Sequence, residues 1–207
     1  MSKEFRHFIP ESARYRGREF EYDVFSEVKA TPEYEEAILK ILNKRDLEVV
    51  KRIREGIEFT KELRPIVNEI LRKIEKEKEK IMDIVKNYQP FDPTNPIDPR
   101  KPTQTFLKDL RLSIIEKLEL DLEEKKVKVY TSVNTPLDVI GIDSFIVLED
   151  DRPRVVTLDA TLRREKLEKL QKADIVFSEL PDPEINEEEY LQEVDKIADR
   201  IVRMWKS

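Results

Sequence analysis

Residues 141–161 read GIDSFIVLEDDRPRVVTLDAT, and this stretch decides the fold that the sequence predicts. Two β-branched, apolar runs flank a short charged turn, which is the pattern of a β-hairpin. Pairing Leu148 with Arg154 sets Asp143 opposite Asp159. Directly opposed like charges destabilise a strand pair, and a divalent cation between the two carboxylates would reverse that penalty. The hairpin therefore predicts half of a metal site.

Both faces of this hairpin are largely apolar, as expected for a sheet that has helices on both sides. Asp143 shares a face with Phe145, and Asp159 shares one with Thr157, because side chains alternate along a strand. Two buried carboxylates need a cation or basic partners. The alternative to a metal ion is that Arg or Lys side chains from neighbouring helices pair with the two aspartates.

The amino-acid composition excludes several classes of binding site. The chain has 207 residues, enough for one large domain or two small ones. It has no Cys and one His, which excludes disulfides, thiolate zinc sites and His-rich metal sites. Charged residues make up 41%, a composition like that of thermophile proteins, where ion-pair networks help at high temperature. The net charge of −6 gives no global attraction to nucleic acid.

The hydropathy pattern predicts no membrane segment. No apolar run approaches the roughly 18 residues that a membrane-spanning helix needs. The first ten residues, MSKEFRHFIP, lack the apolar core of a signal peptide. We therefore expect a cytoplasmic protein without a membrane partner.

Residues 1–30 and the helices after them form the first part of the chain. Aromatic and Arg residues alternate over residues 1–30 without clear periodicity, which predicts an arm with little regular structure. Such an arm packs its aromatic side chains on its own domain or on a partner subunit, or it binds single-stranded nucleic acid. Three amphipathic helices follow. Thr31 is expected to cap the first and Asp46 the second, while the third covers residues 60–88 with a kink at Pro65.

Prolines at every third position mark residues 89–104 as a linker. Polyproline II has three residues per turn, so these prolines would line one edge of a stiff rod. The rod is either a spacer or a docking motif for a proline-binding partner. We predict a domain boundary here, between an all-α domain with its arm (1–88) and an α/β domain (105–207). The all-α domain is also a candidate for homo-oligomerisation.

The second domain alternates helices and strands. We expect a helix over residues 106–124, a strand over 127–133, the hairpin, a helix over 162–173 and a strand over 175–177. Asn186 is expected to cap a final amphipathic helix. This order predicts an α/β fold with a mixed sheet flanked by helices.

The order helix–strand–hairpin–helix–strand resembles the PD-(D/E)XK nuclease superfamily, which has the restriction-endonuclease-like fold. The residues that carry the resemblance form a D..GID.F pattern, with Asp138, Gly141, Asp143 and Phe145, followed by the acid Asp159 on the next strand. The N-terminal helices match no family that the motifs identify.

The resemblance covers roughly residues 105–178 and assigns roles within them. It implies that Asp143 and Asp159 bind Mg²⁺ or Mn²⁺. In this superfamily a helix Glu often supports the metal, and Glu116 is the first candidate, with Glu119 next. Hard cations of this kind prefer carboxylate oxygens, which agrees with the assignment.

One position departs from the superfamily pattern. The motif places a Lys two residues after its second acid, and here that position is Thr161. Thr cannot offer a positive charge to a phosphate. Lys166 on the following helix is the nearest replacement, with Arg163 and Arg164 behind it.

The sequence therefore predicts a metal-dependent nuclease that acts on nucleic acid, DNA rather than RNA. In this hypothesis Asp143, Asp159 and Glu116 hold Mg²⁺ or Mn²⁺, and Lys166 replaces the missing lysine. The alternative is an inactive nuclease-like domain that serves nucleic-acid binding or protein assembly.

Overall fold

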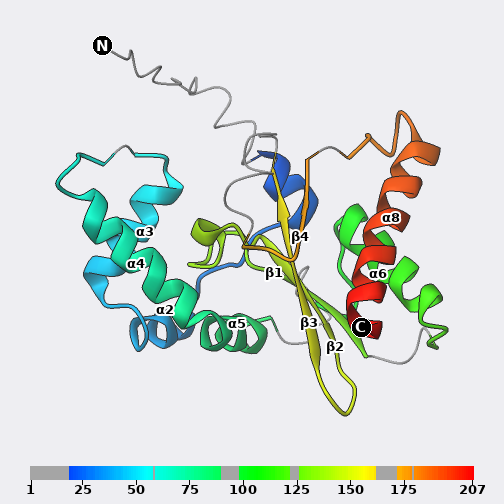
Figure 1. Ribbon diagram of the computed structural model, residues 1–207, viewed down its shortest axis with the longest axis horizontal. Coiled ribbons are helices and arrows are strands. Elements are labelled where there is room, and N and C mark those ends of the chain that lie inside the picture. Colours follow the sequence, from blue (N-terminus) through cyan, green and yellow to red (C-terminus); the bar gives the residue numbers. More distant parts are fainter. Residues whose placement is uncertain (1–18, 58, 90–97, 122–125, 162–171, 179) are drawn as a thin grey trace.

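A mixed sheet lies between two groups of helices in the computed structural model of the protein (Figure 1). One group, α2 to α5, comes before the sheet in the chain, and the other consists of α6 and α8. The expected mixed α/β fold class is confirmed at this level. The structure describes residues 19–57, 59–89, 98–121, 126–161, 172–178 and 180–207.

The sheet has the strand order β1-β2-β3-β4. Strands β1 (Val127–Thr131) and β2 (Ser144–Leu148) are antiparallel, as are β2 and β3 (Arg154–Ala160). Strand β4 (Ile175–Phe177) runs parallel to β3, which makes the sheet mixed. The three residues of β4 were expected as a strand, and this prediction is confirmed.

The register of the β2–β3 hairpin is the predicted one. Leu148 pairs with Arg154, and the pairing continues to Ser144 with Leu158. Asp143 lies one residue before the last of these pairs, at the end of the sheet that is distant from the hairpin turn. The register therefore brings the two aspartates to one end of the sheet.

Helices α6 (Thr105–Lys117) and α8 (Glu187–Lys206) pack on each other and cover one face of the sheet. Strand residues Ile146 and Leu158 face this side. The shared core is apolar because each helix turns one stripe inward. Its largest members include Phe25, Phe106, Leu110, Ile114, Val156, Phe177, Ile197, Ile201 and Trp205.

The opposite face of the sheet is covered by the helices α2 (Pro32–Leu39), α3 (Lys44–Arg54), α4 (Arg64–Lys76) and α5 (Lys78–Asn87), which we call the helical unit. The apolar stripes of these helices are buried in the interior of the protein. One continuous cluster joins them to the strands, and it includes Tyr34, Val50, Ile74, Ile81, Val85, Tyr130, Phe145 and Val147. The division into domains at the Pro-rich linker stays a prediction, because residues 90–97 lie outside the described part of the chain.

Two predicted helix caps are confirmed and one is wrong. The Thr31 hydroxyl accepts from the Tyr34 N–H at 3.2 Å, and Asn186 caps α8. Asp46 does not cap α3; the cap is Asn43, whose side-chain oxygen accepts from the Asp46 N–H at 2.9 Å. Asp46 instead accepts a hydrogen bond from a lysine of α4, because the two helices pack together.

The prediction of one continuous third helix over residues 60–88 is wrong. Pro65 does not kink a helix but lies in the first turn of α4, where its missing N–H costs nothing. The chain breaks instead at Glu77, between α4 and α5. Helix α6 also ends earlier than expected, at Lys117, and Glu119 adopts a left-handed φ of 54°. Strand β1 likewise ends at Thr131, two residues short of the prediction.

Residues 19–25 are helical, so the prediction of little regular structure over residues 1–30 is wrong there. The reason is tertiary packing. The ring of Phe25 is fully buried and makes edge contacts with Phe106 and Phe177, at centroid distances of 6.0 and 5.9 Å. The arm residues 1–18 and most of the expected helix over 162–173 lie outside the described residues.

A search of the described residues finds no helix with the length and hydropathy required to cross a membrane.

We expect Phe145→Ala to destabilise the whole structure by about 3–5 kcal/mol, because it removes a large side chain from the core shared by the sheet and the helical unit. Phe145 is fully buried and stacks on Tyr130 with ring centroids 5.0 Å apart. Urea unfolding followed by circular dichroism measures the change. Ile185→Ala is the control, since Ile185 is 85% exposed. Equal stabilities for the two variants would contradict the described packing.

Candidate metal centre

Asp143 lies immediately before β2 and is 2% exposed. Its backbone N–H donates to the Leu158 carbonyl at 2.9 Å, and its Oδ2 accepts from the Ala160 N–H at 2.9 Å. Both contacts join the residue to the end of β3. The side chain is therefore held in the interior of the protein.

Asp159 lies on β3 and is 6% exposed. Its Oδ2 lies 3.2 Å from the point that a Cβ atom would occupy at Gly141, and Gly141 has a left-handed φ of 74°. A side chain at residue 141 would meet both the strained backbone and the carboxylate. The glycine of the GID pattern therefore lets the chain pass directly beside Asp159.

Two further carboxylates approach Asp143. Asp138 begins the short 3₁₀ helix η1 (Asp138–Ile140), and Glu21 belongs to the helical residues 19–25. One carboxylate oxygen from each of Glu21, Asp138 and Asp143 lies within 4.8 Å of the others. Asp159 acts electrostatically on Asp143. We call Glu21, Asp138, Asp143 and Asp159 the acidic cluster.

The acidic cluster is electrostatically unfavourable. Burial raises the pKa of Asp143 well above its ordinary value, and the charges of Glu21, Asp159 and Asp138 raise this pKa further. The Ala160 N–H acts in the opposite direction. Of the described groups that act on this carboxyl, none is a base. The alternative in which Arg or Lys side chains neutralise the pair thus finds no support at Asp143 among the described residues.

Hydrogen bonds bring Glu21 and Asp138 to the sheet from two distant segments. The Val28 N–H donates to the Val133 carbonyl at 3.0 Å, and the Thr131 hydroxyl donates to the Ser26 carbonyl at 3.1 Å. These bonds fasten the segment that follows Glu21 to the loop that leads to Asp138. The two carboxylates are therefore fixed by the same local network.

The structure does not bring Glu116 to the acidic cluster. Glu116 is exposed and lines a groove between α6 and α8, together with Asp109 and Asp195. Helix α6 covers the face of the sheet that carries Ile146, and turns its apolar residues toward that face. Glu119 lies beyond the end of α6.

The other sequence-predicted residues divide into two groups. Thr161 is 5% exposed, and its N–H donates to the Phe177 carbonyl at 2.9 Å, at the end of the sheet where Asp159 lies. Lys166, Arg163 and Arg164 lie outside the described residues. Their proposed role as the replacement for the motif lysine stays a prediction.

Sequence reasoning assigned no role to Glu21 or Asp138, although both had a signal. Asp138 is the first acid of the D..GID.F pattern. Phe20 and Val24, on either side of Glu21, have the i, i+4 spacing of a helix face. The position of Glu21 beside the sheet depends on contacts with residues more than a hundred positions away.

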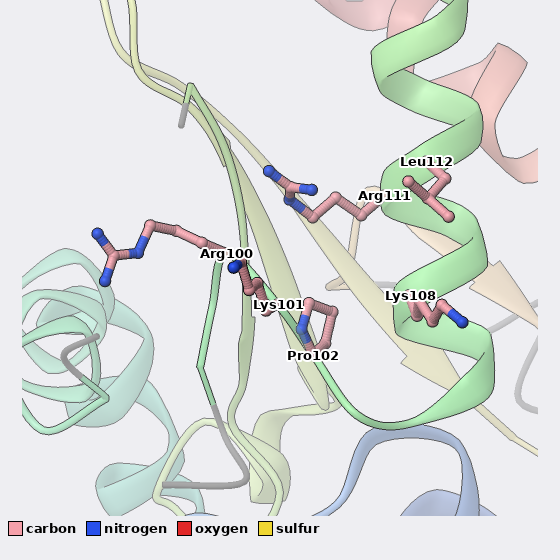
Figure 2. Close-up of a pocket in the computed structure, with 6 residues that line it drawn as sticks. All are labelled: Arg100, Lys101, Pro102, Lys108, Arg111 and Leu112. Atoms are coloured by element: carbon pink, nitrogen blue, oxygen red, sulfur yellow. The ribbon is translucent and has the colours of Figure 1, made fainter. Parts of the chain in front are cut away.

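A hollow of about 210 Å³ elsewhere on the surface is lined by Arg100, Lys101, Lys108 and Arg111. Figure 2 shows that the Arg100 guanidinium and the Lys108 ammonium point to opposite sides of it. The Arg111 Nε donates to the Val127 carbonyl at 2.8 Å. These bases do not converge, so the hollow does not form an anion site.

Comparisons of the chain with protein-family models, with curated proteins and with solved structures found no match.

The pH dependence of stability should identify Asp143 as a buried acid. Its raised pKa means that the folded state keeps a proton that the unfolded state has lost, so its contribution to stability falls as pH rises, by up to about 1.4 kcal/mol per pH unit. Asp143→Asn lacks this titration. In metal-free buffer the variant should gain stability relative to the unmodified protein as pH rises above the ordinary pKa of aspartate, as urea unfolding would measure.

Asp195→Asn is the matched control with the opposite sign. A hydrogen bond from Lys117 lowers the pKa of Asp195, so its stabilising contribution is present above its ordinary pKa and is lost at low pH. This variant should lose stability relative to the unmodified protein as pH rises. A stability difference for Asp143→Asn that does not change with pH would contradict the described environment of the acidic cluster.

Proposed function

We propose that the protein is a metal-dependent phosphodiesterase that acts on nucleic acid, DNA rather than RNA. The observation that carries the proposal is the approach of three carboxylates: Asp143 is buried, Glu21 and Asp138 are half-buried, and no base acts on Asp143 among the described groups. Asp159 lies outside this group of three, and its charge also acts on Asp143. A restriction-endonuclease-like fold is part of the proposal, supported by the strand order and by the D..GID.F pattern.

The donor set suits Mg²⁺ or Mn²⁺. Hard cations take carboxylate oxygens at about 2.0–2.6 Å, so two oxygens that share an ion lie up to about 5 Å apart. The separations of up to 4.8 Å between the oxygens of Glu21, Asp138 and Asp143 agree with this. A bound ion would also oppose the two effects that raise the pKa of Asp143, its burial and the repulsion from neighbouring carboxylates.

The residues of the cluster would hold the ion and fix its place relative to the substrate phosphate. A divalent ion of this kind lowers the pKa of a bound water and stabilises negative charge on the phosphate. Asp143 immediately precedes β2, and Asp159 lies on β3, the strand that pairs with β2. Glu21 and Asp138 complete the cluster from the helical residues 19–25 and from η1.

One observation favours a second candidate function. Thr161 stands where the superfamily pattern has a lysine, and a threonine hydroxyl carries no positive charge. In this second candidate the protein retains the metal site and binds nucleic acid without cleaving it. Cleavage assays distinguish the two candidates, because metal binding is common to both.

We expect one Mn²⁺-binding event in isothermal titration calorimetry and Mn²⁺-dependent cleavage of DNA. Asp143→Asn and Asp159→Asn should each weaken Mn²⁺ binding at least tenfold and abolish cleavage, since each removes a ligand charge. Absence of Mn²⁺ binding at millimolar concentration would contradict both candidates. Binding without cleavage of any DNA or RNA would contradict the nuclease and favour the second candidate.

A paired comparison tests which glutamate belongs to the metal centre. Glu21→Gln should weaken Mn²⁺ binding about as much as Asp143→Asn does, because its carboxylate approaches Asp143. Glu116→Gln should leave Mn²⁺ affinity unchanged, because Glu116 lies in the groove between α6 and α8. The reverse pattern would favour the sequence-based assignment of Glu116.

A further inference from the structure

Arg54 connects the helical unit to the loop that carries Asp138. It is the last residue of α3, and its Nη1 donates to the Asn134 carbonyl at 3.2 Å. Its Nε lies 3.6 Å from Asp138 Oδ2, and its side chain is 24% exposed. A guanidinium carries five N–H donors in a fixed fork, so one side chain can hold two acceptors in a defined relative position.

The same loop is fixed from within by Asn134. Its backbone N–H donates to Asp138 Oδ2 at 3.1 Å, and its own φ is 73°, a left-handed value that Asn tolerates better than most residues. Its side-chain amide donates to the Val28 carbonyl at 3.5 Å. The oxygen Asp138 Oδ2 therefore lies between the Asn134 N–H and the Arg54 guanidinium.

Tyr34 is a third part of this contact. Its side chain is 5% exposed, and its hydroxyl has no hydrogen-bond partner among the described residues. Burial raises the pKa of Tyr34, and the charge of Arg54 lowers it. The charge of Arg54 therefore acts on the Tyr34 hydroxyl as well as on Asp138.

We propose that Arg54 is a positioning residue for the metal centre, through which the helical unit sets the orientation of Asp138 and thereby the affinity for the metal. The inference rests on the proposed function, because it assumes that Asp138 is a ligand. It gives the helical unit a direct part in the site. The metal centre then depends on residues from both sides of the Pro-rich segment.

Two physical effects of Arg54 on metal binding have opposite signs. As a nearby positive charge, Arg54 repels a cation, so its removal should tighten metal binding. As a group that orients a ligand, it favours binding, and loss of such partners typically weakens metal affinity about 10–100-fold. If Arg54 positions Asp138, the second effect dominates, because Asp138 lies on the short helix η1 and not on a strand.

The test is Mn²⁺ affinity, measured by calorimetry on the full chain. Arg54→Gln should weaken Mn²⁺ binding about 10–100-fold. Arg54→Lys keeps the charge but loses the fork, so it should recover only part of that loss. Arg52→Gln is the matched control on the same helix, because Arg52 packs over the Phe59 ring at 5.2 Å, away from the loop. This control should bind Mn²⁺ like the unmodified protein.

Unchanged or tighter Mn²⁺ binding by Arg54→Gln would overturn the inference and leave the proposed function standing. Absence of Mn²⁺ binding in the unmodified protein would overturn both. If Arg54→Gln does not fold, Arg54→Lys decides alone, since full affinity in that variant excludes a role for the fork. Circular dichroism of each variant without metal separates a loss of fold from a loss of affinity.

Discussion

The structure brings four acidic side chains close together, and the rest of the molecule must offset their repulsion. They belong to Glu21, Asp138, Asp143 and Asp159. Asp143 is buried, and burial together with the charges of the three neighbouring carboxylates raises its pKa, so its ionised form opposes folding. A protein keeps such an arrangement only if other interactions hold the segments in place. A cation that binds the folded state alone would add stability in proportion to its occupancy.

Three parts of the chain supply the forces that hold the acidic cluster together. The β2–β3 ladder fixes Asp143 and Asp159, since a one-residue shift of the register would move the side chains of a strand to the opposite face of the sheet. A backbone hydrogen bond from the Val28 N–H to the Val133 carbonyl holds the segment of Glu21 against the sheet. The helical unit adds Arg54, which contacts the loop of Asp138. The helical unit and the segment of Glu21 thus both contribute to the structure around this end of the sheet.

The sequence predicted features that depend on neighbours in the chain and missed those that depend on packing. Alternation and a short turn were enough to predict the hairpin register and the pairing of its two aspartates. The break at Glu77 and the cap at Asn43 were missed because several nearby residues could serve equally well. Glu21 was missed because its place beside the sheet depends on contacts of residues 26–28 with residues 131–133, far away in the sequence. Glu116 was misplaced because the choice of sheet face belongs to tertiary structure.

The most direct test of this account is a crystal structure of the protein grown with Mn²⁺, with anomalous scattering used to locate the ion. The account predicts an anomalous peak within about 2.0–2.6 Å of carboxylate oxygens of Asp143 and of at least one of Glu21, Asp138 and Asp159. A peak beside Glu116 in the groove between α6 and α8, or no peak at the acidic cluster, would contradict it.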